Sequence, residues 1–320
     1  KKRDKLITST DKIGKLASIP IVVNTVNAVN QNKTMRRLLD KQLGIHPEAV
    51  IPAYHTDTAR KQFAKQSPQA IDVQACEETT GKVAIFTTCY GNYNRPDLVK
   101  DLVAVYQHNG ILGEMCQQEK CCGMPKLELG DLEEVERLKN NNIPALARLV
   151  DAGFDIVAPV PSCVLMFKQE LPLMFPDDPD VLKVRDAMFD PFEYLMIRHK
   201  GGLLRTEFKE EIGEVSYQVA CHLRVQNIGQ KTKELLELIP NTSVKAHERC
   251  SGHDGTYALK SEFHDISKKI ARPIVNKVDK ESTAVFSSDC PMAADHIASG
   301  LKNEKAVQNP MSLLKQAYGL

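Results

Sequence analysis

A chain of 320 residues is long for one hydrophobic core, so two or three domains are expected. Its 42 Lys and Arg residues balance 41 Asp and Glu residues to a net charge of +1, which lacks the basic excess of proteins that bind nucleic-acid backbones, so no nucleic-acid partner is expected. Nine cysteines, an odd count in a chain of this size, disfavour a disulfide framework and favour reduced thiols that bind metal.

Residues 1–80 are expected to form a helical arm followed by a linker. Apolar residues recur at helix-like intervals from Leu6 to Leu43 and indicate two or three amphipathic helices. Residues 61–82 lack this periodicity, which is typical of a linker. No run of about 18 apolar residues occurs, so no membrane-spanning segment is expected. The sequence starts at Lys1 without a leader pattern, and we expect it to begin partway into a longer gene product.

From Val83 onward, short apolar runs alternate with helical patterns, which indicates βαβ units and a parallel sheet. The expected strands cover residues 83–88, 111–115, 155–161, 214–220, 243–248 and 283–288. The expected helices cover about 96–109, 132–152, 231–238 and 257–277. The fold class is therefore α/β, with a first domain over residues 81–200 and a second over residues 201–320.

Cysteines follow six of these strands and form an internal repeat. The distance from Cys89 to Cys221 is 132 residues, and the corresponding offsets for the second and third members are 129 and 127 residues. The paired positions are Cys89 with Cys221, Cys121 with Cys250, and Cys163 with Cys290. The sequence therefore predicts two tandem, pseudo-equivalent cysteine-rich domains.

Three cysteine-bearing strand ends in each repeat are expected to converge, because ligands of open parallel sheets collect beyond the carboxyl ends of the strands. Gly123 and Gly252 follow the central cysteines, where positive φ would let the backbone close around a bulky anionic cluster. Helices that begin behind Cys163 and Cys290 would point N–H groups at the same place.

Four thiolates suit either zinc or an iron–sulfur cluster. The chain contains no C-x-x-C pair of the kind that structural zinc sites usually use, and the adjacent pair Cys121-Cys122 with Gly123 favours a multi-iron cluster. Cys76 in the linker and Cys116 outside the repeat are expected to be spare thiols.

The spacing Cys-x31-Cys-Cys-Gly-x39-Cys, followed by Cys-x28-Cys-Ser-Gly-x37-Cys, resembles the duplicated cysteine-rich (CCG) domain family of iron–sulfur proteins. That family includes the C subunit of anaerobic glycerol-3-phosphate dehydrogenase and, at a greater distance, the B subunit of heterodisulfide reductase. The resemblance rests on Cys121-Cys122-Gly123-Met124-Pro125, Pro161-Ser162-Cys163, Cys221-His222-Leu223, Glu248-Arg249-Cys250-Ser251-Gly252 and Ser288-Asp289-Cys290-Pro291.

The resemblance implies one 4Fe-4S cluster in the first repeat, which keeps four cysteines: Cys89, Cys121, Cys122 and Cys163. The second repeat keeps Cys221, Cys250 and Cys290, because Ser251 stands where the pair's second cysteine would be. This second centre is expected to be a three-thiolate iron–sulfur cluster, to be completed by a histidine, to leave one iron open for substrate, or to be zinc.

The sequence differs from heterodisulfide reductase at two positions that bear on this expectation, and three residues beside the cysteines bear on it as well. Heterodisulfide reductase repeats close with C-x-x-C, but Met166 and Ala293 stand at those positions here, so a five-thiolate centre is not expected. His222 and His253 are candidate ligands or hydrogen-bond partners of the cluster sulfurs. Arg249 would raise a cluster potential, hold an acidic substrate, or be a plain solvated charge.

The expected function is that of an iron–sulfur electron-transfer subunit of an oxidoreductase complex. It would take electrons from a flavin dehydrogenase partner, with glycerol 3-phosphate as the substrate that the resemblance suggests, and pass them towards a quinone or another carrier. A ferredoxin-like module with further clusters is expected as a second partner, before Lys1 if it exists.

Two alternatives remain open at this point: a heterodisulfide-reductase-like catalytic subunit and a zinc-stabilised interaction scaffold. The resemblance implies a role in anaerobic respiration and glycerol metabolism. The expected location is the cytoplasm, with peripheral contact at the inner face of the membrane as an open expectation.

Overall fold

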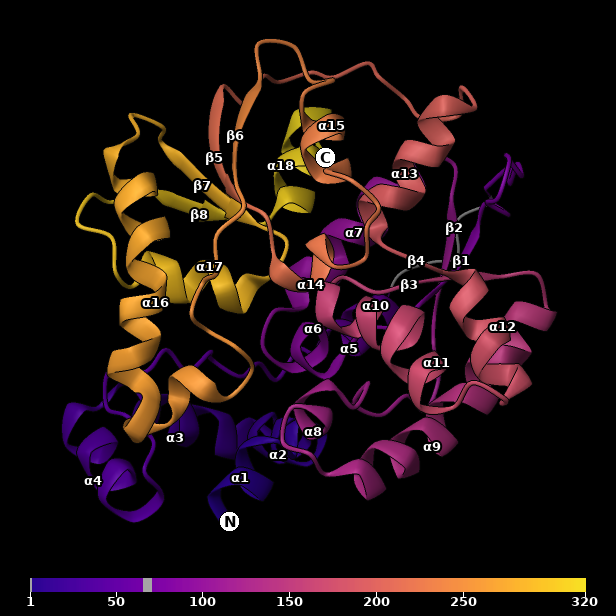
Figure 1. The fold of residues 1–320 in the computed structure, drawn as a ribbon. Coiled ribbons are helices and arrows are strands. Elements are labelled where there is room, and N and C mark those ends of the chain that lie inside the picture. Colours follow the sequence, from indigo (N-terminus) through magenta and orange to yellow (C-terminus); the bar gives the residue numbers. More distant parts are fainter. Residues whose placement is uncertain (1, 66–70) are drawn as a thin grey trace.

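The computed structural model of the chain describes residues 2–65 and 71–320. It has two four-stranded parallel sheets surrounded by helices, and a helical arm precedes them (Figure 1). The expected α/β class, with two pseudo-equivalent parallel-sheet domains after a helical arm, is confirmed.

The first sheet has the strand order β2-β1-β3-β4 with all neighbours parallel. Its strands are β1 (Lys82–Ile85), β2 (Leu112–Met115), β3 (Asp155–Val157) and β4 (Met188–Phe189). Its helices are α6 (Cys89–Tyr93), α7 (Pro96–His108), α8 (Met124–Leu127), α9 (Leu132–Asp151), α10 (Pro161–Leu165), α11 (Leu171–Met174), α12 (Pro179–Ala187) and α13 (Pro191–Lys200), with a π-helical turn at Met166–Glu170.

The second sheet repeats this topology in the order β6-β5-β7-β8. Its strands are β5 (Glu214–Gln218), β6 (Ser243–His247), β7 (Val285–Ser288) and β8 (Ala306–Gln308). Its helices are α14 (Cys221–Arg224), α15 (Lys231–Leu236), α16 (Ser261–Lys280), α17 (Pro291–Ala298) and α18 (Pro310–Tyr318), with a 3₁₀ turn at Tyr257–Leu259. In both sheets the first strand of the repeat lies between the second and the third.

Local sequence explains why these elements form. Residues 83–85 of β1 are completely buried, as expected for a parallel strand covered on both faces. Helix α7 starts with Pro96, whose missing N–H is not needed at the first helical position. Helix α13 starts with a capping box, in which Asp190 accepts from the Glu193 amide and the Glu193 carboxylate accepts from the Asp190 amide.

One apolar core joins the two halves. Val99, Leu102 and Tyr106 of α7 belong to the same buried cluster as Leu235 and Leu236 of α15. Helix α18 packs against both of these helices and contributes Leu313, Leu314 and Tyr318 to the cluster. The two sheets are therefore fixed relative to each other by side-chain packing.

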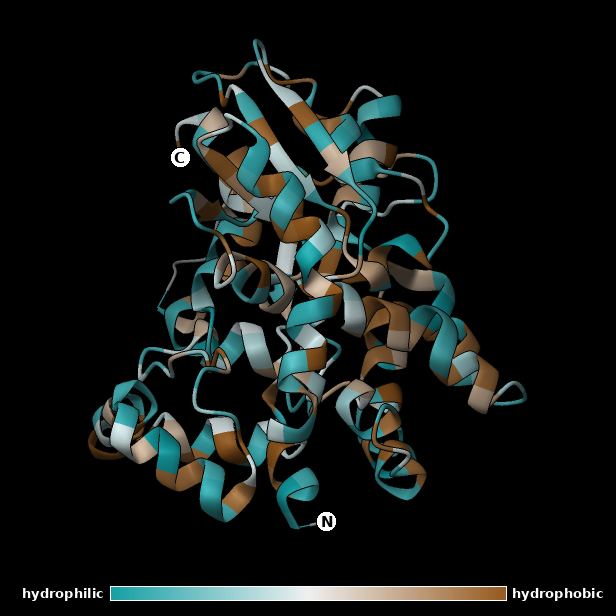
Figure 2. Cartoon of the chain, turned by 60° about the vertical axis from the view of Figure 1, so that its left-hand side comes forward, coloured by the Kyte–Doolittle hydropathy of each residue, from teal (hydrophilic) through white to brown (hydrophobic). Residues whose placement is uncertain are grey.

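Within residues 2–65, the arm consists of five helices instead of the two or three expected. They are α1 (Lys2–Ile7), α2 (Thr10–Ala17), α3 (Pro20–Gln31), α4 (Lys33–Leu43) and α5 (Ala59–Ala64). Apolar and polar segments alternate along them (Figure 2), and Leu16 and Ile21 are 62% and 85% exposed. Within residues 2–65 and 71–320, none of the helices combines the length and apolar content needed to cross a bilayer.

Some expected boundaries differ from the structure. The strand expected over 155–161 ends at Val157, because Pro159 and Pro161 have no N–H for the ladder. The expected linker starts inside α5, contains a bridge between Cys76 and Thr79, and includes residues 66–70, which lie outside the described residues. The short strands β4 and β8 were not expected.

Candidate metal centre

In the first repeat, the cysteines stand where the chain leaves β1, β2 and β3. Cys89 is the first residue of α6, Cys121 and Cys122 lie in the loop between β2 and α8, and Cys163 lies in α10. The backbone of Thr88 has φ of +64°, and its hydroxyl accepts the Gly91 amide at 2.9 Å, which fixes the turn into α6.

The second repeat places its cysteines in the same way after β5, β6 and β7. Cys221 begins α14, Cys250 follows β6, and Cys290 is the N-cap residue of α17. The amides of Met292 and Ala293 point at the Cys290 sulfur and oppose the rise of its pKa, which burial brings to about 11. The helix N-terminus expected behind Cys290 is therefore present.

All seven repeat cysteines line one cavity of about 870 Å³ between the two halves and the arm. The strand-end cysteines thus converge, as the repeat predicted. Cys76 and Cys116 do not line this cavity. Cys116 is 2% exposed, and burial raises the pKa of its thiol well above the ordinary value, which keeps it protonated.

The four thiols of the first repeat form a contiguous row in the order Cys89, Cys121, Cys122, Cys163. Hydrogen bonds from the thiols of Cys122 and Cys89 to the Cys121 sulfur hold the pKa of Cys121 well below its usual range. The same hydrogen bonds, together with burial, raise the pKa values of Cys122 and Cys89. A cationic group bound beside Cys121 would replace the protons that these thiols share.

The second set has the same pattern with one sulfur fewer. The Cys221 thiol donates to the Cys250 sulfur, which lowers the pKa of Cys250 to about 6 and raises the pKa of Cys221. The Gly252 amide lies 3.4 Å from the Cys250 sulfur and donates to it. Ser251, the residue in place of the pair's second cysteine, is buried, lines the cavity and accepts the His253 amide at 3.2 Å.

The glycines behind the central cysteines have the positive φ that was predicted, +104° at Gly123 and +74° at Gly252. A Cβ at Gly252 would lie 2.3 Å from the carbonyl oxygen of Ser267, so no larger residue fits there. This backbone conformation keeps the loops close to the cavity.

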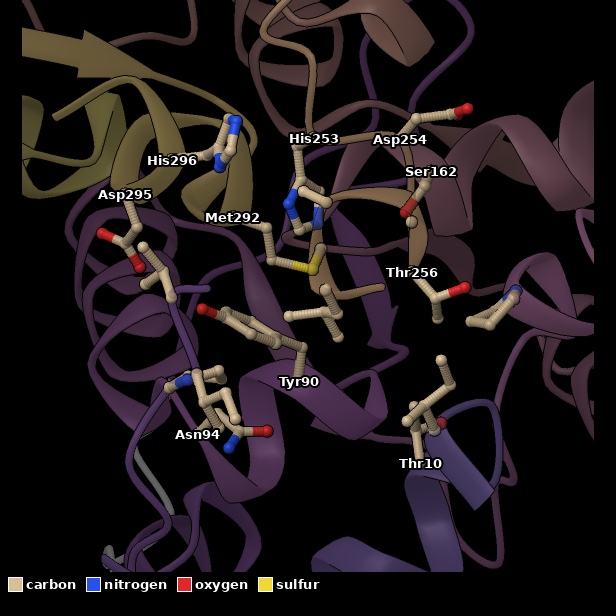
Figure 3. Close-up of a pocket in the computed structure, with 18 of the residues that line it drawn as sticks. Thr10, Tyr90, Asn94, Ser162, His253, Asp254, Thr256, Met292, Asp295 and His296 are labelled. Atoms are coloured by element: carbon tan, nitrogen blue, oxygen red, sulfur yellow. The ribbon is translucent and has the colours of Figure 1, made fainter. Parts of the chain in front are cut away.

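Of the three candidate residues beside the cysteines, two line the cavity and one is exposed at the surface. His222 and His253 line the cavity, and burial lowers the pKa of His253 to about 4, so its ring is neutral. The Nε2 atom of His253 is buried without a hydrogen-bond partner. Figure 3 shows His253, Met292 and Tyr90 pointing into the middle of the cavity from different elements. Arg249 is exposed and does not line the cavity.

The arm closes the cavity, and the sequence did not predict this. The hydroxyl of Thr10 in α2 lies beside the Cys121 sulfur and contributes to the low pKa of this thiol. The carboxylate of Asp11 accepts the Cys121 amide, and burial followed by the nearby Cys121 raises the pKa of Asp11 to about 6. Apolar residues of the arm, among them Ile13, Val26 and Val29, complete the lining. An amphipathic helix pattern shows which face is buried but not what it is buried against.

The donor set fits an iron–sulfur cluster. Four thiols, one of them with a lowered pKa, face one buried space, and amide groups of Gly123 and Gly252 donate to the sulfurs of Cys121 and Cys250. Thiolate ligands with backbone N–H donors are the surroundings that stabilise such anionic clusters.

Comparisons with known proteins give results for both halves. The family model described as "CCG: Cysteine-rich domain" matches residues 83–168 and 215–292. The chain is 26% identical over 318 residues to the C subunit of the anaerobic glycerol-3-phosphate dehydrogenase of Escherichia coli strain K12, which covers 98% of this chain and 77% of the relative.

Two further relatives match a smaller share of this chain. The B subunit of the fumarate reductase (CoM/CoB) of Methanothermobacter marburgensis is 25% identical over 246 residues, 74% of this chain and 46% of the relative. "Lactate utilization protein A" of Oceanobacillus iheyensis is 27% identical over 199 residues, 60% of this chain and 78% of the relative.

Proposed function

Because the chain belongs to the cysteine-rich (CCG) domain family, we propose that it is an iron–sulfur electron-transfer subunit of an oxidoreductase complex. The observation that carries this proposal is the convergence of all seven repeat cysteines on one cavity. The subunit takes electrons from a flavin dehydrogenase partner and passes them to a quinone or another carrier. The similarity to a glycerol-3-phosphate dehydrogenase subunit supports glycerol 3-phosphate as the partner's substrate.

In this proposal Cys89, Cys121, Cys122 and Cys163 hold a 4Fe-4S cluster, which supplies one-electron redox chemistry when bound. The second centre is held by the three thiols of Cys221, Cys250 and Cys290. His253, with its neutral ring and unpartnered Nε2, is the side chain best suited to complete it. His222 is half-buried beside Cys221 and serves as a hydrogen-bonding neighbour.

The arrangement of the first-repeat thiols in a row, where a single zinc ion needs a tetrahedron, supports an iron–sulfur cluster over zinc. A tetrahedral zinc site with bonds of about 2.3 Å places its sulfurs roughly 3.8 Å apart. Among residues 2–65 and 71–320, no three cysteine sulfurs lie within 4.8 Å of one another. A row of thiols does not surround one tetrahedral ion.

The shape of the cavity supports a quinone as the acceptor. Its wall on the arm side, with residues of α1 to α4, is mostly apolar, and its opposite wall carries the cysteines. A flat apolar ring system could lie between the two walls. The exposed side chains of Leu16 and Ile21 support a peripheral contact of the arm with the inner face of the membrane, which would place the protein in the cytoplasm.

The domain boundaries belong to the same proposal: an arm and linker over residues 1–80, a first cysteine-rich domain over 81–200 and a second over 201–320. A ferredoxin-like module is proposed as a further electron-transfer partner. Two of the relatives are named as subunits of a dehydrogenase and of a reductase, which supports a role inside a larger complex.

The test is iron and acid-labile sulfide analysis with EPR on protein purified without oxygen. Cys122→Ser should remove one of two signals, while Cys116→Ser, which alters a buried cysteine outside the cavity, should keep both. Protein that contains neither iron nor sulfide after anaerobic purification would overturn the proposal.

A second candidate function is a heterodisulfide-reductase-like catalytic subunit, and Cys250 is the observation that favours it. This thiol is exposed at the cavity and has a pKa of about 6, so it is a thiolate at neutral pH. Reduction of a disulfide to two thiols consumes two electrons and two protons, with the electrons delivered by the flavin partner. Disulfide turnover that Cys250→Ser abolishes while iron content is unchanged would favour this function.

A further inference from the structure

Two histidines and a glutamate from distant parts of the chain meet outside the cysteine cavity. His46 and Glu48 lie in the loop after α4, and His264 lies in the first turn of α16. One ligand atom from each of the three side chains lies within 4.8 Å of the other two. Among residues 2–65 and 71–320, this is the group of three or more ligand-type side chains that meets that distance.

His264 has a buried ring nitrogen without a partner. The side chain is 2% exposed, and its Nδ1 lies 2.8 Å from the carbonyl oxygen of Ala258. Because a carbonyl only accepts, Nδ1 carries the proton and Nε2 carries a lone pair. No group donates to this Nε2, and a buried unsatisfied acceptor is costly. A histidine whose Nδ1–H is held by a carbonyl is oriented to bind a cation through Nε2.

His46 lies directly against His264. The two rings are stacked with centroids 3.8 Å apart and planes 10° apart. Burial lowers the pKa of His46, and the neighbouring His264 adds to this effect. The Nδ1 of His46 accepts the Glu48 amide at 3.2 Å, so a cation that binds His46 displaces either this hydrogen bond or the proton on Nε2.

The loop that carries His46 is held in place from both sides. Buried Arg36 donates from Nη2 to the carbonyl oxygen of His46 at 2.7 Å, and the His46 amide donates to Leu259 at 2.9 Å. Ile45 forms an antiparallel bridge with Lys260. The backbone positions of the two histidines are thus set before any ligand arrives.

Glu48 supplies the negative charge that two neutral imidazoles lack. Its carboxylate is exposed and can adjust its rotamer, and Asp40 and Asp265 add negative charge around His46. Two imidazoles and one carboxylate are a ligand set for zinc, with a fourth position left for water. The nearly parallel rings must tilt towards each other for both lone pairs to reach one ion.

We propose that His46, Glu48 and His264 form a zinc site that joins the loop after α4 to α16. This site is separate from the iron–sulfur chemistry of the cysteines, and it does not depend on the electron-transfer function. A bound ion would connect residues 46 and 264, and so would stabilise the packing of the arm on the second half of the chain.

The test uses the anaerobically purified holoprotein, dialysed against a chelator and then titrated with ZnCl₂. Zinc X-ray absorption should show only nitrogen and oxygen ligands at about 2.0–2.1 Å, without the sulfur shell near 2.3 Å that cysteine binding produces. His46→Gln and His264→Gln should each lose this zinc. His199→Gln, a half-buried histidine in α13, is the matched control and should keep it.

Thermal melts show whether each variant is folded and whether zinc stabilises it. Zinc should raise the melting temperature of the wild type and of His199→Gln, but not that of the two site variants. If a buried-site variant fails to fold, Glu48→Gln at the exposed position should still fold and bind zinc at least tenfold more weakly. The proposal is overturned if zinc does not bind, or if it binds through sulfur with the same stoichiometry in the wild type and in His46→Gln, His264→Gln and Glu48→Gln.

Discussion

The ring of Tyr93 in α6 lies directly over Gly14 in α2: a Cβ built on Gly14 would be 2.3 Å from Cδ2 of the ring. This contact lets the arm approach the element that begins with Cys89. Gly14→Ala should push α2 away and lower the free energy of unfolding by about 1–3 kcal/mol, the usual cost of overpacking. Denaturant unfolding measures the loss.

The contact predicts strong coupling between the two residues. Tyr93→Ala removes the obstructing ring, so the double variant should lose less stability than the two single variants together. Additive losses would show that the ring is not what excludes a side chain at position 14.

Arg36 should be needed for the loop at residues 46–49. Its buried guanidinium donates to the carbonyl oxygens of His46, Pro47 and Ala49 at 2.7–3.1 Å. Arg36→Met leaves these acceptors without their donor, and we expect a loss of about 2–4 kcal/mol with faster hydrogen exchange in the loop. Exposed Arg37 in the same helix is the control, and Arg37→Met should change neither quantity.

Asp190 should make the protein less stable as the pH rises. Burial, with Asp289 and Glu193 nearby, raises the pKa of Asp190 to about 7 in the folded state, compared with about 3.9 when unfolded. The folded state therefore binds the proton more tightly. The stability that results is fully present below pH ~4 and is lost as pH rises through about 7, by up to roughly 4 kcal/mol.

Asp190→Asn keeps an N-cap oxygen for the Phe192 amide but cannot ionise, so it should flatten this part of the stability–pH profile. Asp178 is the matched control because it also caps a helix, and its hydrogen bond with Lys139 lowers its pKa. Its contribution is present above the unfolded pKa and is lost as pH falls, so Asp178→Asn should destabilise at neutral pH. A profile unchanged by Asp190→Asn would contradict the prediction.

Ser251→Cys should restore a fourth thiol in the second set. Ser251 is buried, lines the cavity and occupies the position that Cys122 has in the first repeat. If the second centre is an iron–sulfur cluster, iron per chain should rise and its EPR signal should change, whereas Ser251→Ala should leave both as in the wild type. Identical iron content and spectra in Ser251→Cys and wild type would show that position 251 does not face the metal.

The cysteine convergence could be predicted from the sequence because two local signals agree. Buried apolar runs mark the strands, and cysteines recur after them at offsets of 127–132 residues. Parallel strands then place these positions at one edge. The strands β4 and β8 have two and three residues, which is too short for a periodic pattern to be recognised.

Contacts between distant segments could not be predicted in this way. Nothing in the pattern around Thr10 or Asp11 indicates that they contact Cys121, which is 110 residues further along the chain than Asp11. The stacking of His46 on His264 likewise depends on how α4 and α16 come together. Such contacts follow from tertiary packing, and a local periodic pattern does not indicate them.

The apolar cluster that α7, α15 and α18 share bears on how the protein unfolds. Duplicated domains with separate cores melt independently, but here neither half can lose its packing without exposing side chains of the other. Calorimetry should therefore record one cooperative transition for both repeats. Damage to one set of thiols then lowers the melting temperature of the whole molecule.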